Sequence, residues 1–148
     1  MIRLCLLLAA TTAITAATAQ TYDSTLAKQW KADAYGMRLY TLVMLRTGPA
    51  LKGTKAHEDS LQMAHLNNIK RLADEGKLVL AGPLGKNDHQ YEGIFILATS
   101  KIDEAKAWVE SDPAVQAHEL EPEYLRWYAS ASVMGIPDAH KKVQKESF

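Results

Sequence analysis

Apolar and polar positions along the chain follow two patterns, one typical of strands and one typical of helices. Four stretches rich in bulky and β-branched side chains predict strands at residues 37–46, 78–81, 91–99 and 124–128. Between the first two, helical spacing predicts a long helix over residues 55–75, and Gly76 stands where a left-handed C-cap is expected. A second helix is predicted to begin at Ser100. The order of elements is therefore β-α-β-β-α-β.

Capping signals refine the second half of the chain. Asp103 follows Ser100 by three residues, which predicts a weak capping box. Asp112 and Pro113 are typical of an N-cap and a first helical position. They predict one or two further helical turns before the last strand.

The same patterns divide the chain into segments. Residues 25–34 have helical composition and belong to an N-terminal arm or helix at residues 20–36. One compact domain is expected at residues 37–128, because a chain of this length is too short for two domains. Residues 129–148 form a C-terminal tail, which we expect to be peripheral.

Both faces of the predicted sheet are apolar. In a β-α-β-β-α-β chain, right-handed crossovers place both helices on one face of an antiparallel sheet, a ferredoxin-like α+β fold. The first strand presents bulky apolar residues on both sides, with Leu39, Val43 and Leu45 opposite Tyr40, Leu42 and Met44. The face without helices needs a second cover. The simplest interpretation is a homodimer that packs sheet against sheet, and the alternative is that the tail or the arm covers this face.

The first residues have the features of a secretory signal peptide. Arg3 provides a positive start, residues 4–10 are apolar, and residues 17–19 read Ala-Thr-Ala, a cleavage pattern. Residues 1–19 are therefore expected to be removed on export, which predicts a secreted or periplasmic protein. The only cysteine, Cys5, lies inside this segment, so the mature chain has no disulfide.

Charge excludes two classes of partner. Removing Arg3 with the signal peptide leaves 16 basic and 17 acidic side chains, a formal charge of −1. So balanced a chain offers no electrostatic basis for binding nucleic acid or an anionic membrane.

A polar stripe interrupts the buried side of the long helix. At about 100° per residue, Glu58, Gln62 and His65 fall within the arc that also carries the apolar residues. Those apolar residues are Leu61, Leu66, Ile69, Leu72 and Ala73. Three buried polar groups need partners or a wet cavity, which favours a cleft at the N-terminal end of the helix. The alternative is a solvated helix end with His65 as a satisfied core histidine.

Two blocks of sequence resemble the YCII-related (YciI-like) family. They read AHLNNIKRLADEGKLVLAGPL and SKIDEAKAWVESDPAVQAHELEPE, and the resemblance spans residues 37–128. It implies a ferredoxin-like subunit that dimerises through its sheet, a dimeric α+β barrel. It also implies a site built on the histidine of the first block, His65, and on an aspartate, for which Asp112 is the match. Many relatives have an arginine where this chain has Gln62. The missing cation argues against a substrate whose negative charge would be bound at this position.

A His–Asp pair suits general acid–base chemistry. Imidazole titrates near neutral pH, and a carboxylate on one ring nitrogen fixes the tautomer and raises the basicity of the other. The sequence has no nucleophile motif, no metal-ligand spacing and no phosphate-loop glycine pattern, so we expect neither a metal nor another cofactor. Tyr40 and Trp127 are candidates to line the cavity with Glu58 and Gln62.

Two functions remain open at this stage. One is an exported cofactor-free enzyme of lyase or isomerase type that acts on a small molecule through His65 and Asp112. The other is a non-enzymatic ligand-binding or accessory domain with the same cleft.

Overall fold

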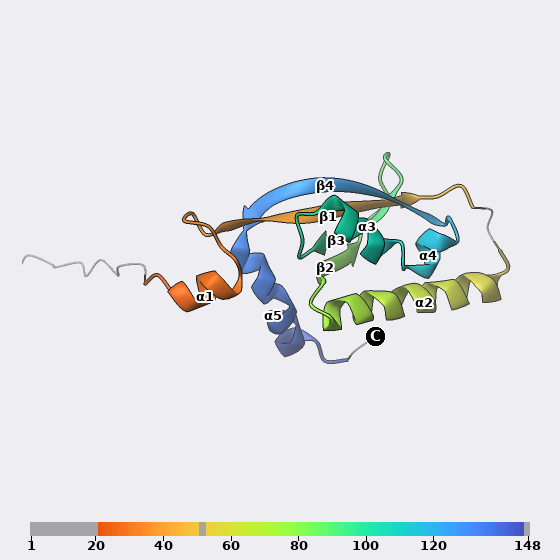
Figure 1. The fold of residues 1–148 in the computed structure, drawn as a ribbon. Helices are drawn as coiled ribbons and strands as arrows, with labels where there is room; N and C mark the ends of the chain where they lie inside the picture. Colours follow the sequence, from red (N-terminus) through yellow and green to blue (C-terminus); the bar gives the residue numbers. More distant parts are fainter. Residues whose placement is uncertain (1–20, 51–52, 147–148) are drawn as a thin grey trace, which may run out of the picture.

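The computed structural model describes residues 21–50 and 53–146, so the expected signal peptide lies outside the described residues. The sheet has four strands in the order β2-β3-β1-β4, and neighbouring strands are antiparallel. The strands are β1 (Met37–Thr47), β2 (Leu78–Pro83), β3 (Tyr91–Leu97) and β4 (Leu120–Ser130). Figure 1 shows helices α2 (Lys55–Asp74), α3 (Ile102–Val109) and α4 (Pro113–Gln116) on one side of this sheet. The fold is ferredoxin-like α+β, as the sequence predicts.

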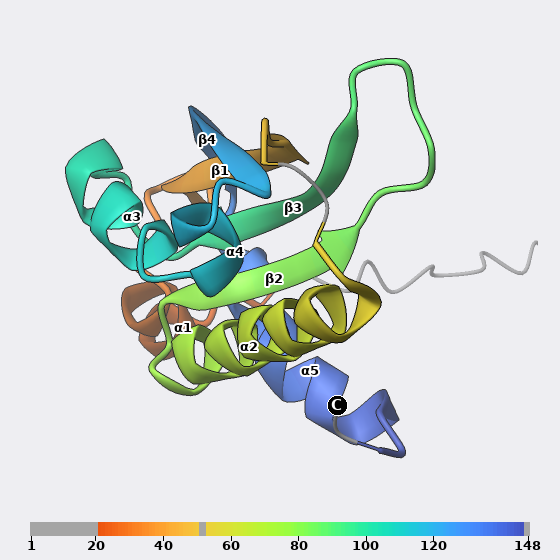
Figure 2. The same ribbon diagram turned by 90° about the vertical axis from the view of Figure 1, so that its right-hand side faces the viewer.

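The first face of the sheet carries the main core. Side chains from β1, β2, β3, α2 and α3 pack there into a single buried cluster. Its members are Val43, Leu45, Leu72, Leu78, Phe95, Leu97, Ala105 and Val109. Figure 2 shows α2 lying along β2, with α4 next to α2 and α3 farther away, beyond α4. This packing fixes the position of α2 over the sheet.

Most predicted boundaries are confirmed to within a few residues. Helix α2 ends at its C-cap Glu75, and Gly76 takes the left-handed conformation with φ +67°. The capping box at Ser100 is wrong: α3 begins at Ile102, and its N-cap residue makes no side-chain capping bond. The backbone N–H of the N-cap residue Lys101 instead donates to the hydroxyl of Thr99, which follows β3, at 3.1 Å.

The N-terminal arm is attached to the sheet. Its helix α1 (Ser24–Gln29) is shorter than the predicted one, because Asp23 caps it and Lys31 leaves the helical conformation with φ 55°. Arg38 of β1 donates to the carbonyl of Trp30 at 3.0 Å and to the carbonyl of Ala98 at 2.8 Å. The arm is therefore anchored by a strand side chain.

The start of the C-terminal tail covers one end of the second face, which is the sheet face opposite α2, and its last helix lies at the β2 edge, beside α2. The tail forms η1 (Ala131–Gly135) and α5 (Ile136–Val143), and the Tyr40 hydroxyl donates to the carbonyl of Ser130 at 3.0 Å. The apolar side chains packed together there are Tyr40, Val79, Ile96 and Ala129, with Val133 and Met134 of the tail beside them. The tail is thus not merely peripheral.

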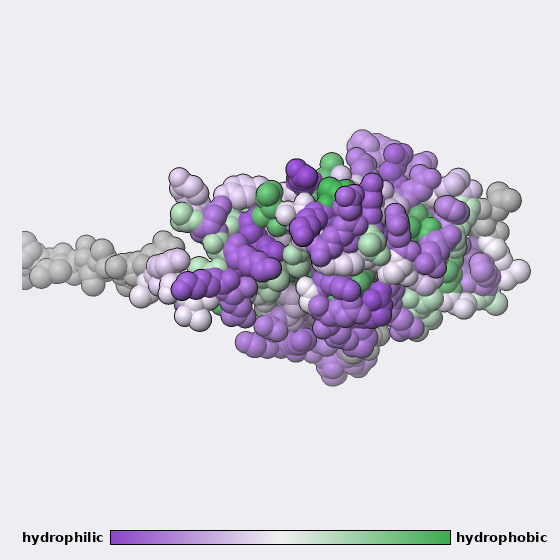
Figure 3. Space-filling model, viewed as in Figure 1, coloured by the Kyte–Doolittle hydropathy of each residue, from purple (hydrophilic) through white to green (hydrophobic). Residues whose placement is uncertain are grey.

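The other end of the second face stays open. Leu42, Met44 and Ile94 are half-buried there, and Leu125 is 44% exposed. Figure 3 shows a different side of the molecule, where hydrophilic side chains dominate and hydrophobic ones form small separate areas. In residues 21–50 and 53–146, no helix is long and apolar enough to cross a membrane.

The buried hydroxyl of Tyr124, on the first face of the sheet, is expected to lower the free energy of unfolding. Burial raises the pKa of Tyr124 to about 12, and its oxygen is buried without a hydrogen-bond partner in the described chain. We expect Tyr124→Phe to raise the free energy of unfolding at neutral pH by up to about 1 kcal/mol, because an unsatisfied polar atom is removed. Urea denaturation measures this change.

The same variant should alter the alkaline limb of the stability curve. A phenol with a raised folded-state pKa favours the neutral form, so its contribution is present below about pH 10 and is lost as pH rises towards about 12. Tyr124→Phe should lose less stability than the parent over this range. Tyr35→Phe, at an exposed position, is the control, and an equal effect from it would contradict the assignment.

Candidate functional site

A cavity of about 690 Å³ lies between the first half of α2 and the sheet. The three side chains of the polar stripe, Glu58, Gln62 and His65, all line it. Apolar side chains, including Leu66 and Phe95, form other parts of its wall. The predicted cleft at this end of α2 is therefore present.

His65 and Asp112 meet at the wall of this cavity. The Nδ1 atom of His65 lies 2.9 Å from each carboxylate oxygen of Asp112. The side chain of Asp112 is fully buried, and that of His65 is 12% exposed. The two residues are 47 positions apart in sequence, and the fold brings them into contact.

Asp112 owes its position to local structure. It is the N-cap of α4, where its Oδ1 accepts the N–H of Ala114 at 2.9 Å and Pro113 occupies the first helical position. Its Oδ2 accepts a hydrogen bond from the Asn68 amide at 2.9 Å. A buried carboxylate needs such donors, and here three groups supply them.

The geometry selects which ring nitrogen of His65 faces Asp112. Since an ionised carboxylate only accepts hydrogen bonds, Nδ1 of His65 is the ring nitrogen that donates to Asp112, so a neutral imidazole would have its lone pair on Nε2. The ring also stacks against Phe95, with centroids 6.0 Å apart and planes inclined by 19°. The residue thus presents to the cavity a ring held on one side by Asp112 and on one face by Phe95.

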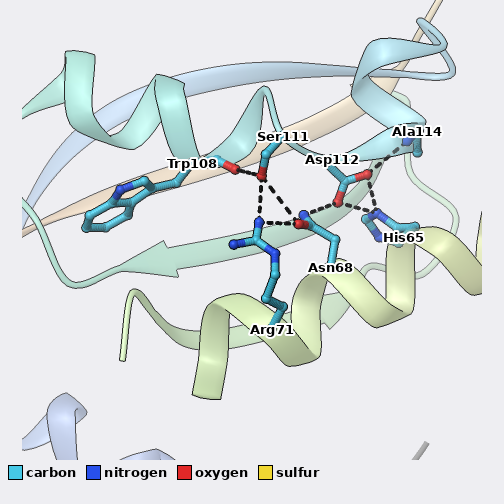
Figure 4. Close-up of polar contacts among 7 residues, drawn as sticks. All are labelled: His65, Asn68, Arg71, Trp108, Ser111, Asp112 and Ala114. Atoms are coloured by element: carbon cyan, nitrogen blue, oxygen red, sulfur yellow. Dashed lines mark hydrogen bonds and ion pairs between the residues drawn. The ribbon is translucent and has the colours of Figure 1, made fainter. Parts of the chain in front are cut away.

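Further polar residues beside the pair were not predicted from the sequence. Figure 4 shows Arg71, Asn68 and Ser111 linked to Asp112 by a chain of contacts. Asn68 is only 6% exposed, although it is polar and lies in the middle of α2. Its position four residues before the core residue Leu72 is the signal that could have revealed its burial.

Tyr40 and Trp127 do not belong to this site. The two rings lie beside each other at 5.8 Å in the packed cluster of the second face, away from the cavity. Their assignment to the cavity is corrected, because alternation along β1 and β4 directs them to the face opposite Phe95.

One wall of the cavity is made by close backbone contact. The N–H of Gly48 donates to the carbonyl of Glu119 at 2.7 Å, where the ends of β1 and β4 meet. A Cβ atom on Gly48 would lie 2.1 Å from the carbonyl oxygen of His118. No side chain fits there, so glycine is required for the chain to close this wall.

The charged lining of the cavity is acidic. Its carboxylates are Glu58, Asp59, Glu92 and Glu119, while the described lining residues include neither lysine nor arginine. Asp59 is paired with Lys55 at 2.7 Å, at an exposed position. In the described part of the chain, no cluster of three or more potential metal ligands occurs.

The fold and this site define an α+β protein of ferredoxin-like topology with a His–Asp pair beside a cavity. The chain belongs to the YCII-related domain family, whose model matches residues 40–127. No curated protein sequence matches the chain significantly.

Among solved structures, the chain is similar to 5-chloro-2-hydroxyhydroquinone dehydrochlorinase from Burkholderia phenoliruptrix, in complex with 2,5-dihydroxybenzoquinone. The identity is 23%, the match covers 61% of this chain and 93% of that one, and the TM-score is 0.43. This similarity is too low to assign an activity.

Proposed function

We propose that this protein is a cofactor-free enzyme in which His65 acts as a general base on a small molecule bound in the cavity. The observation that carries the proposal is the hydrogen bond between His65 Nδ1 and the buried Asp112, on a ring that lines the cavity. Asp112 orients the imidazole and stabilises the imidazolium that forms. The apolar wall suits a cyclic or aromatic substrate.

The reaction class follows from what one base can do. Nε2 of His65 takes a proton from a carbon beside a carbonyl group, and the electron pair of that C–H bond moves into the carbonyl to give an enolate. Return of the proton to another carbon completes an isomerisation. Departure of a leaving group with its bonding pair completes an elimination. Both outcomes balance without any added oxidant or reductant.

Proton abstraction can be tested before the natural substrate is known. The mature protein is incubated with cyclohexanone in heavy water, and deuterium incorporation is followed by NMR. The expected result is exchange faster than in buffer at the same pH. Exchange at the buffer rate with cyclohexanone and with aromatic ketones of similar size would remove the support for a catalytic base.

The acidic lining predicts which ligand charges the cavity accepts. Glu58, Glu92 and Glu119 line the cavity in addition to Asp59, whose charge is paired with Lys55, so an anion is repelled and a neutral or cationic molecule is favoured. Benzylamine and benzyl alcohol should therefore bind more tightly than benzoate, with a difference of about tenfold or more at low salt. Chemical-shift changes at the His65 ring measure the affinities. Tighter binding of benzoate would contradict the proposal.

A non-enzymatic ligand-binding domain is the second candidate. It is favoured by the absence of a lysine or arginine from the described lining, because such a cation would stabilise the negative charge of an enolate. Under this alternative the same probes bind, but deuterium exchange stays at the buffer rate. The two measurements together separate the candidates.

We also propose that the mature protein is an exported homodimer. The signal-peptide pattern of residues 1–19 supports export, and N-terminal sequencing of the exported protein should start at Gln20. The open end of the second face, with Leu42 and Leu125, supports a sheet-to-sheet dimer. Sedimentation should show a dimer at micromolar concentration, and a monomer would overturn this part of the proposal.

A further inference from the structure

We infer that Asn68 is a positioning residue for the His65–Asp112 pair, and that Arg71 holds the Asn68 amide in the only orientation that serves the pair. The inference rests on the proposed role of His65 as a base, since it assigns what keeps that base in place. It concerns side chains that touch neither the ligand nor the reacting atoms.

Asn68 anchors the side of Asp112 that the helix cap leaves free. The backbone N–H of Ala114 holds Oδ1, and the Asn68 Nδ2 group holds Oδ2 at 2.9 Å. Both oxygens also lie 2.9 Å from His65 Nδ1. With a donor fixed at each oxygen, the carboxylate cannot rotate away from the imidazole without breaking a buried hydrogen bond.

An asparagine amide has two orientations, and Arg71 selects one of them. Arg71 Nη2 donates to Asn68 Oδ1 at 2.7 Å, which leaves the Asn68 NH₂ group directed to Asp112. In the reversed orientation, the amide NH₂ would face the guanidinium and the amide oxygen would face the carboxylate. Both contacts would be repulsive, so the guanidinium excludes this state.

Arg71 is itself held by the segment that leads into α4. Its Nη2 also donates to the Ser111 hydroxyl at 2.8 Å, and that hydroxyl donates to the carbonyl of Trp108 at 2.6 Å. The Ser111 proton can also be directed to Asn68 Oδ1 at 3.3 Å, and in either case the hydroxyl oxygen is free to accept from Arg71. The guanidinium thus joins α2 to the segment that carries Asp112.

The order of the chain explains how one helix supplies the whole arrangement. His65, Asn68 and Arg71 are spaced three residues apart on α2, so their side chains follow an oblique row across its surface. Figure 4 shows this row facing Ser111 and Asp112. The half-exposed guanidinium of Arg71 contacts Asn68, Asn68 contacts Asp112, and Asp112 contacts the imidazole of His65 at the cavity.

The inference is tested by NMR of the His65 ring in the ligand-free protein. Asn68→Leu removes the donor to Asp112 while keeping a side chain of similar size. We expect exchange of the His65 Nδ1 proton with water to become about tenfold faster, and the ¹⁵N shifts of the ring to move towards a mixture of tautomers. Asn67→Leu, the same change at the exposed neighbouring position, is the control and should leave both signals unchanged.

A second variant tests the role of Arg71 and does not depend on a buried substitution. Arg71→Met should shift the same His65 signals in the parent, and should add little in the Asn68→Leu background, because Arg71 acts through Asn68. Glu75→Gln removes the negative charge that Arg71 Nη1 contacts at 2.8 Å, and should have no effect on the ring.

Two outcomes overturn the inference. One is an unchanged Nδ1 exchange rate in both Asn68→Leu and Arg71→Met. The other is equal effects of Arg71→Met with and without Asn68. Because the readout needs no ligand, it stands apart from the deuterium exchange test. If the unmodified protein exchanged deuterium only at the buffer rate, the proposed function would be refuted. The effects of the variants on the His65 ring signals would still test the role of Asn68.

Discussion

Replacing His65 by glutamine is expected to slow deuterium incorporation into cyclohexanone by about 10²- to 10⁴-fold, the usual contribution of a positioned general base. Glutamine keeps a polar side chain at the cavity wall, but its amide does not accept a proton near neutral pH. The protein should stay folded, because the His65 side chain borders the main core through Phe95 but is not a member of it. The initial rate of exchange, followed by NMR at saturating ketone, measures the effect.

The control for this variant is His57→Gln. His57 is exposed on the same helix and does not line the cavity, so the same substitution there should leave the rate unchanged. Equal losses in both variants would show that the effect does not come from a base in the cavity. An unchanged rate in His65→Gln would assign the exchange to another group.

The largest loss of stability is expected for Asp112→Ala. This change removes the N-cap of α4 and leaves the His65 ring and the Asn68 amide without a buried acceptor. We expect the free energy of unfolding to fall by about 3–5 kcal/mol, as when one partner of a buried pair is removed. Urea denaturation at neutral pH measures the change.

Two further variants show where that loss comes from. Asp112→Asn should lose less stability than Asp112→Ala, because the asparagine oxygen can still accept the Ala114 N–H. Some stability should still be lost, because a second amide then faces Asn68. Asp88→Ala, at an exposed loop position, should change stability by less than about 0.5 kcal/mol. A loss below 1 kcal/mol for Asp112→Ala would contradict the role of the carboxylate as a shared acceptor.

The fold was predictable because its signals are local and strong. Bulky residues marked each strand, and Gly76 marked the end of α2 within one residue. Strand β4 runs from Leu120 to Ser130 and was predicted too short, because Pro122 and the glutamates near it hide its start. β4 is an edge strand, where proline is tolerated, and sequence pattern does not reveal which strand lies at an edge.

The site was predictable only in part. His65 and Asp112 were expected from the resemblance, and the structure brings them together, while their catalytic role stays a prediction. Asn68 and Arg71 escaped notice because a wheel built from apolar residues does not display an oblique row of polar ones. Tyr40 was misplaced for a different reason. Once both faces of a strand are apolar, its sequence does not show which face borders a cavity.

The double use of Asp112 affects how relatives should be compared. The same carboxylate closes the N-terminus of a helix of only four residues and orients the imidazole. Even without the proposed catalysis, the aspartate would be under selection, because its loss would remove the N-cap of α4. An aspartate at this position is therefore a weak marker of activity among homologues. The histidine, whose loss costs the fold less, is the more informative residue.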